Sequence, residues 1–240
     1  MRMKMRPWQA LDMAQPDPDA LPALGADDVA YVRRDFLTLA AACAGRGETA
    51  DQVRRLISER RLPRPTYLLP DRTEMVPPDY FELHDAAGGV GPLPAWFARR
   101  LGEELTARAM DASAAHIEEE WTAYLAGEYG ACLRRVSPAA IAEKARLIAS
   151  IEDLVAGARR GDVAWRAALR RDVDLLDGMV REFARWDRLR FGGPLSRDRL
   201  ITAVRERHAD LWSGGPASAT GAPTSPAPGR APVDADARRS

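Results

Sequence analysis

Apolar residues recur at helical spacing through most of the second half of the chain. One such run extends from Ala95 to about Leu125, with a break expected near Asp111. Ser137-Pro138 then provides an N-cap serine with proline at the first helical position. Asp162 is expected to begin a further helix, which continues to the turn Gly192-Gly193-Pro194. Several amphipathic helices joined by short connections predict a helical bundle.

The first half of the chain has shorter patterns. The apolar stretch Leu37–Ala44 predicts a helix, and Thr49 provides the N-cap of a second helix with one apolar face. Two short runs, Thr66–Leu69 and Glu74–Val76, flank a polar turn and predict a hairpin. The glycine-proline cluster Gly88–Pro92 follows, and it is the expected boundary between two parts of the chain.

These patterns predict a mainly α protein, in which a winged-helix-like N-terminal module with a short β-hairpin packs on a C-terminal helical bundle. Residues 1–25 are expected to form an irregular arm, residues 26–92 the module, residues 93–212 the bundle and residues 213–240 a disordered tail. The tail is expected to be disordered because it is rich in Ala, Pro, Gly and Ser and has no aromatic residue with which to build a core.

Composition narrows the class of protein further. Lys and Arg together number 35, and Asp and Glu together also number 35, which argues against a uniformly basic nucleic-acid binder. Two cysteines are too few for a disulfide scaffold. No apolar run reaches the length of a membrane span or of a signal-peptide core, so a cytoplasmic protein without a membrane partner is expected. Lys4 and Lys144 are the only lysines, which is typical of a GC-rich bacterial genome.

The segment LTLAAACAGRGETADQVRRLISERRLPRPTYLLPDRTEMVP has the order helix, turn, helix, hairpin. It resembles the winged helix-turn-helix of the MerR-like regulators and excisionases, except that Arg60 stands where glycine is usual. The resemblance implies a recognition helix that carries Arg54 and Arg55, with Arg60 nearby, and it implies DNA as a partner. Asp51 and Glu59 on the same helix weaken the positive field, and a winged helix used only for packing or protein contact is the alternative.

Two further groups of residues could carry chemistry. His116 and Glu120 lie one helical turn apart, so they could act as an acid/base pair or form an ordinary hydrogen bond at the edge of the bundle. Arg190 and Arg197 flank the turn before the last helix, where Ser196 is the expected cap. They could clamp an anionic substrate group there, or form a salt-bridged corner with nearby acids.

The segment Tyr124–Leu133 contains two glycines around Tyr129, which suggests a turn that presents Tyr129 and Cys132 together. Tyr129 is therefore a candidate substrate contact, whereas Cys132 is either a nucleophile in need of a base or a buried structural thiol. The sequence contains no phosphate-loop, dinucleotide-binding or hydrolase signature, and it has too few suitably spaced ligands for a metal site. No cofactor and no metal are expected, and no motif fixes a reaction.

The stretches RRLPRPTYLLPDRTEMVPPDYF, YLAGEYGACLRRVSPAAIAEKARLI and WDRLRFGGPLSRDRLITAVRERH together resemble an actinobacterial family of uncharacterised proteins associated with natural-product biosynthesis. This resemblance implies a role in antibiotic and other secondary metabolism, without catalytic residues to carry over. The expected function is to bind and transform a small-molecule intermediate by acid/base chemistry. A MerR-like DNA-binding regulator and a non-catalytic partner of a biosynthetic enzyme are the alternatives.

Overall fold

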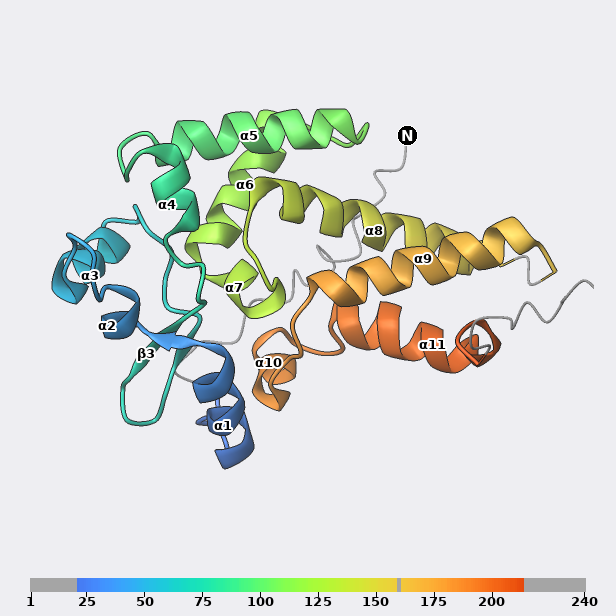
Figure 1. Cartoon of the computed structure of the whole chain (residues 1–240), viewed down its shortest axis with the longest axis horizontal. Helices are drawn as coiled ribbons and strands as arrows, with labels where there is room; N and C mark the ends of the chain where they lie inside the picture. The colour runs from blue at the N-terminus through green and yellow to red at the C-terminus, as the bar shows by residue number, and fades with distance from the viewer. Residues whose placement is uncertain (1–20, 159–160, 214–240) are drawn as a thin grey trace, which may run out of the picture.

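The computed structural model describes residues 21–158 and 161–213 (Figure 1). Most of the expected irregular arm and nearly all of the expected disordered tail lie outside these residues. In the described part, short N-terminal elements occupy one end of the molecule, and two long helices, α8 (Pro138–Ala156) and α9 (Val163–Met179), extend to the other end. None of the described helices is both long and apolar enough to cross a membrane.

The N-terminal elements form a small module of short helices and short strands. Its strands form an antiparallel sheet in the order β1-β3-β2, so the first strand pairs with the last strand of the hairpin. The module comprises α1 (Ala26–Asp35), β1 (Leu37–Thr38), α2 (Leu39–Ala42), α3 (Ala50–Ser58), β2 (Tyr67–Leu68) and β3 (Glu74–Val76). Thr49 caps α3 as predicted, because its side chain accepts a hydrogen bond from the Gln52 N–H while the Gln52 side chain accepts one from the Thr49 N–H.

One prediction for this module is wrong. Leu37 and Thr38 were expected to begin a helix, but they form β1, in which Leu37 pairs with Val76 and Thr38 with Met75. The helix begins only at Leu39, and the Thr38 side chain caps it by accepting the Ala41 N–H at 3.0 Å. Pairing with a strand almost forty residues away decides the backbone here, and local apolar spacing carries no sign of that pairing.

The chain then becomes almost entirely helical. The break expected near Asp111 is confirmed, since α5 ends at Ala107 and α6 begins at Ala114 under a Ser113 cap. Ser137 and Asp162 cap α8 and α9 as expected, by accepting backbone N–H groups of the first helical turn. The remaining helices are α4 (Glu82–Ala87), α5 (Leu93–Ala107), α6 (Ala114–Leu125), α7 (Glu128–Cys132), α10 (Arg185–Arg190), the π-helix η3 (Asp198–Thr202), α11 (Ala203–Arg207) and the 3₁₀ turn η4 (Ala209–Leu211).

The helix expected to run from Asp162 to Gly192 is interrupted. It ends at Met179, and Val180 forms an antiparallel bridge with Leu133. The Arg181 N–H donates to the Cys132 carbonyl at 2.9 Å, and the Arg181 guanidinium donates to the Leu133 carbonyl at 2.9 Å. These long-range bonds hold an extended segment before α10. The last helical segment also differs, because the Asp198 carboxylate accepts the Leu195 N–H at 3.0 Å where a Ser196 cap was expected.

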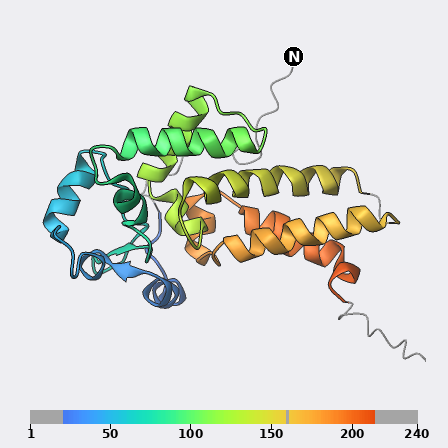
Figure 2. The ribbon, with the colours of Figure 1, turned by 45° about the horizontal axis from the view of Figure 1, so that its top comes forward.

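Apolar residues of the described chain form three clusters. The largest spans the module and the next five helices, α4 to α8, and α5 contributes Leu93, Phe97 and Leu101, which are fully buried. A second cluster lies between α8, α9 and the C-terminal helices, and Figure 2 shows α5, α8 and α9 side by side. The first cluster continues across the Gly88–Pro92 segment without interruption, so the division of the chain at that segment stays a prediction.

A buried carboxylate joins the module to the bundle. The Tyr67 hydroxyl and the Ala184 N–H both donate to Asp187 Oδ2, each at 2.9 Å. Asp187 is fully buried, and its Oδ1 atom has no hydrogen-bond partner among the described residues. Burial raises the pKa of Asp187 to about 6, although the Tyr67 hydroxyl and the Arg190 guanidinium act in the opposite direction.

Candidate functional site

A cavity of about 350 Å³ lies where α6, α7 and α8 face the segment that contains α10 and leads into η3; we call it the bundle cavity. Its volume suits a small organic molecule. Most of its wall is apolar and is formed by Ala123, Ile141, Ala145, Ile148, Phe183, Phe191, Pro194 and Leu195. Its polar and ionisable residues are Glu120, Glu128, Tyr129, Cys132, Lys144, Ser196 and Arg199.

Local sequence explains why α7 and α8 present these residues together. Gly127 precedes α7 with φ of 76°, a left-handed conformation that turns the chain sharply from α6 into α7. The short α7 then supplies Glu128, Tyr129 and Cys132 to the wall. In α8, the cavity residues from Ile141 to Ile148 are spaced by three, four and seven positions, so they share one face of the helix.

The structure brings His116 and Glu120 together as the sequence suggested. His116 Nε2 lies 3.5 Å from Glu120 Oε1, and the two residues are 3% and 2% exposed. The sequence placed Ile117 and Trp121 inward and this pair near the edge of the buried face, whereas the pair is more deeply buried than either of them. Glu120 contributes to the cavity wall and His116 does not, so a ligand would meet the carboxylate, with the imidazole beside it.

Cys132 and Lys144 form a second close pair at the cavity wall. Lys144 Nζ donates to Cys132 Sγ at 3.1 Å, across the turn between α7 and α8. Glu143, which precedes this lysine, is engaged elsewhere, because its carboxylate pairs with Arg108 at 2.9 Å and with Arg146 at 2.5 Å. The Lys144 ammonium forms no salt bridge with a described residue. No described carboxylate oxygen therefore lies within 4.0 Å of its nitrogen.

The two arginines expected to clamp an anion have other partners. Arg190 donates to the Thr66 carbonyl at 2.8 Å, and its guanidinium lies over the Phe191 ring. Arg197 pairs with Asp177 at 2.6 Å. Neither contributes to the described wall of the bundle cavity, where Arg199 is present instead and pairs with Glu152 at 3.2 Å. Tyr129 lines the cavity, and its role as a substrate contact stays a prediction.

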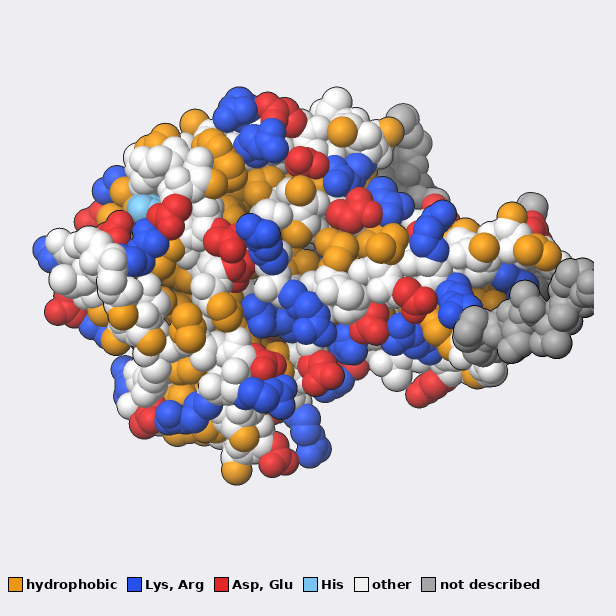
Figure 3. All heavy atoms as spheres, viewed as in Figure 1, with side chains coloured by type: hydrophobic (Ala, Val, Ile, Leu, Met, Phe, Trp, Pro, Cys, Tyr) orange, Lys and Arg blue, Asp and Glu red, His pale blue; other side chains and the backbone are white. Residues whose placement is uncertain are grey.

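The arginines proposed to contact DNA lie on the exposed side of the module. Arg54, Arg55 and Arg60 are all exposed, and Arg60 follows α3 with φ of 56°. Arg54 is already paired, to Asp51 at 2.6 Å and to Glu74 of β3 at 2.7 Å. Figure 3 shows acidic and basic side chains next to one another over this end of the molecule, without a continuous positive patch on the face in view.

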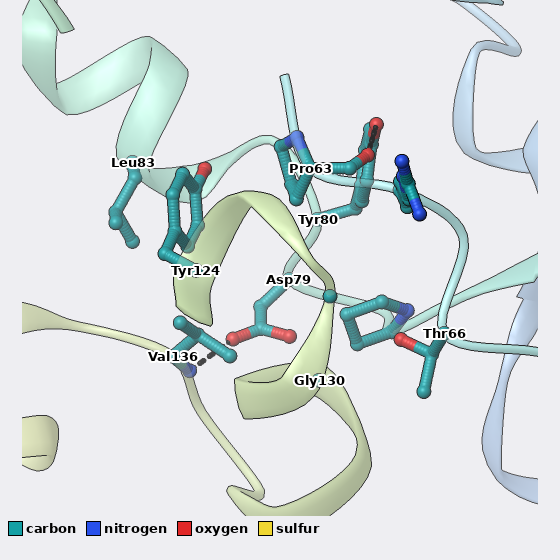
Figure 4. A pocket seen from close by; sticks show the side chains of 11 residues that line it. Pro63, Thr66, Asp79, Tyr80, Leu83, Tyr124, Gly130 and Val136 are labelled. Atoms are coloured by element: carbon teal, nitrogen blue, oxygen red, sulfur yellow. Dashed lines mark hydrogen bonds between the residues drawn. The ribbon is translucent and has the colours of Figure 1, made fainter. Parts of the chain in front are cut away.

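A second, much smaller cavity lies between the module and α7 (Figure 4). Its volume is about 20 Å³, enough for a single water molecule. Asp79 Oδ2 accepts the Val136 N–H at 2.5 Å, and Figure 4 shows Tyr124 and Thr66 on opposite sides of this carboxylate in the view. Asp79 Oδ1, Thr66 Oγ1 and the Tyr124 hydroxyl have no hydrogen-bond partner among the described residues, and burial raises the pKa of Asp79. This cavity is too small for a substrate.

Sequence reasoning missed Lys144 and Arg199. Arg199 was passed over in favour of two neighbouring arginines, because charge density alone does not say which side chain lines a cavity. A signal for Lys144 was present: it is one of two lysines in a chain of 35 basic residues, and it shares a helical face with Ile141 and Ile148. Across the described residues, no group of three or more His, Cys, Asp or Glu is arranged to hold a metal ion.

Comparisons with known proteins give one match. Neither the curated proteins nor the solved structures include a significant match to the chain. Residues 93–209 match a family described as "Family of unknown function (DUF6058)". The matched segment is just under half of the chain, begins at the first residue of α5 and contains every described residue of the bundle cavity, so the chain is similar to this family in the part that carries its candidate site.

Proposed function

We propose that the protein binds a small-molecule intermediate in the bundle cavity and transforms it by acid/base chemistry, in the setting of bacterial secondary metabolism. The observation that carries the proposal is a cavity of about 350 Å³ with a largely apolar wall and several ionisable groups, since pockets of this type commonly bind small molecules. The proposed biosynthetic setting comes from the sequence resemblance alone.

Glu120 is the acid/base group in this proposal. It lies at the wall within 3.5 Å of His116, and a carboxylate beside an imidazole can exchange a proton with a bound molecule. His116 does not reach the wall, so its part is to position Glu120 and to share its proton. Tyr129 contributes a hydroxyl to the same wall and is the proposed substrate contact.

Binding can be tested by filling the cavity. Ala145→Trp places an indole where the α8 wall now carries a methyl group, and it is expected to abolish binding of the neutral fluorescent probe phenylnaphthylamine. Ala149→Trp is the matched control, because Ala149 lies one turn further along α8 and is exposed. The measurement is probe fluorescence on titration, with circular dichroism to check folding. Equal binding by the wild type and the folded Ala145→Trp variant would contradict the proposed site.

Chemistry is tested separately from binding. Glu120→Gln keeps the shape of the side chain and removes its acid/base function, so product formation in a reconstituted pathway should fall by about 10²–10⁴-fold while probe binding persists. Unchanged product with intact binding would favour the remaining interpretation from the sequence, a non-catalytic partner of a biosynthetic enzyme.

A DNA-binding regulator is the second candidate function. It is favoured by the order and pairing of the module's elements together with the exposed Arg55 and Arg60 near the end of α3. In that case DNA binding should weaken steeply with salt, and Arg55→Ala with Arg60→Ala should abolish it. Fluorescence anisotropy with a duplex at low salt is the measurement. Arg54 is a poor choice for this test because it also pairs with Glu74 in the hairpin. Absence of any shift at low salt would exclude this candidate.

A further inference from the structure

Lys144 is a cation that forms no salt bridge with a described carboxylate, although two glutamates line the same cavity. The only hydrogen bond of its ammonium to a described residue goes to the Cys132 sulfur at 3.1 Å. The carboxylate of the preceding residue, Glu143, forms salt bridges with Arg108 and Arg146. Lys144 is half-buried on the cavity face of α8, where an ammonium loses part of its hydration and gains little from a thiol in return.

The other basic side chain at the wall differs in this respect. Arg199 is exposed and pairs with Glu152 at 3.2 Å, so its charge is both hydrated by solvent and compensated by a carboxylate. Most basic residues in the described part of the chain are arginines, and many of them pair with carboxylates at distances between 2.5 and 3.7 Å. Lys144 is the single described lysine. It lies at the wall of a largely apolar cavity, and its ammonium pairs with no described carboxylate.

We infer that Lys144 anchors the anionic group of a ligand with an apolar body, so that the molecules bound in the bundle cavity are amphipathic acids such as carboxylates or sulfonates. An anion at this position would form a charge-assisted hydrogen bond with the ammonium in partly dry surroundings, where such a bond is strong. The apolar body would lie against Ile148, Phe183 and Phe191. This inference rests on the proposed binding function and names the chemical class of the ligand.

The carboxylates at the wall make the anchor selective. Glu120 and Glu128 line the same cavity and would repel an anion that lay close to them. An acid is therefore accepted in one orientation, with its charged end at Lys144 and Cys132 and away from the two glutamates. The same arrangement would bring Glu120 near an uncharged part of the ligand, where a proton transfer would act.

The test uses two probes that differ in one group. Anilinonaphthalene sulfonate and phenylnaphthylamine share the same aromatic rings, and only the first carries an anion. Lys144→Gln is expected to weaken binding of the sulfonate by about tenfold or more and to leave binding of the neutral amine within about twofold of the wild type. Lys144→Arg retains the charge and should retain most of the preference for the sulfonate. Arg185→Gln, an exposed charge removal outside the cavity, should affect neither probe.

The outcomes separate the inference from the function on which it rests. If Lys144→Gln weakens both probes equally, or neither, the anchor is overturned while the cavity remains a binding site. If neither probe binds the wild-type protein, or both still bind after Ala145→Trp, the proposed binding function itself fails. Thermal unfolding of each variant shows whether a loss of binding comes from unfolding, and Lys144→Met provides a second uncharged variant with a similar chain length.

Discussion

Gly127→Ala is expected to lower the free energy of unfolding by about 3 kcal/mol. Gly127 has φ of 76°, a conformation that costs an alanine about 1 kcal/mol. A Cβ atom at this position would also lie 2.6 Å from the Arg64 carbonyl oxygen, which is backbone and cannot rotate away. The same loop is fixed by a hydrogen bond from the Arg64 N–H to the Leu125 carbonyl at 2.9 Å, so the clash adds about 2 kcal/mol of strain.

Gly45→Ala separates the two contributions. Gly45 has φ of 77°, and a Cβ atom there would meet nothing within 4 Å. This variant should therefore lose only the conformational part, about 1 kcal/mol. Urea unfolding of both variants gives the comparison. An equal loss in the two would mean that the loop at Arg64 yields easily, and that α7 is held to the module less firmly than the structure indicates.

Asp187→Asn is expected to remove a pH dependence of stability worth about 2 kcal/mol between about pH 7 and about pH 4. Burial raises the pKa of Asp187 to about 6 in the folded protein, above its ordinary value of 3.8. The folded state therefore binds this proton more tightly than the unfolded state. The contribution of Asp187 to the free energy of unfolding is lowest above pH 6 and rises as the pH falls toward 4. Asparagine keeps an oxygen that can accept from the Tyr67 hydroxyl and the Ala184 N–H.

The difference between wild type and variant isolates this residue. Carboxyls such as those of Asp85 and Glu143 have pKa values lowered to about 2 by arginine partners, and they change stability in the opposite direction as the pH falls. They are the same in both proteins, so their contribution cancels. In urea unfolding at several pH values, the free energy of unfolding of the wild type should rise relative to that of Asp187→Asn as the pH falls. A constant difference would show that the Asp187 carboxyl titrates normally.

Local sequence signals predicted much of the fold because their causes are local. The Thr49, Ser137 and Asp162 caps act within one helical turn, and the hairpin turn is set by its own residues. The errors occur where distant backbone decides the outcome. Strand β1 exists because β3 pairs with it, and the helix expected through Val180 ends because that residue bridges to Leu133.

The candidate site divides in the same way. His116 and Glu120 were found because a spacing of four residues on one helix implies proximity. The contact between Lys144 and Cys132 joins two helices through a turn, and no spacing rule predicts it. Arg190 and Arg197 were chosen from charge density, yet the structure engages them with Thr66 and Asp177, because packing determines which arginine of a basic segment faces a cavity.

The start of the family match at Leu93 has a consequence for proteins that share only this segment. Leu93 and Phe97 are fully buried in a cluster that also contains Leu39 and Val53 of the N-terminal module. A relative that carries the matched segment without such a module would expose this apolar side of α5 to water. It must therefore supply a different cover for these side chains, from another domain or a second subunit, and the contacts of that cover would differ from those of the module in this chain.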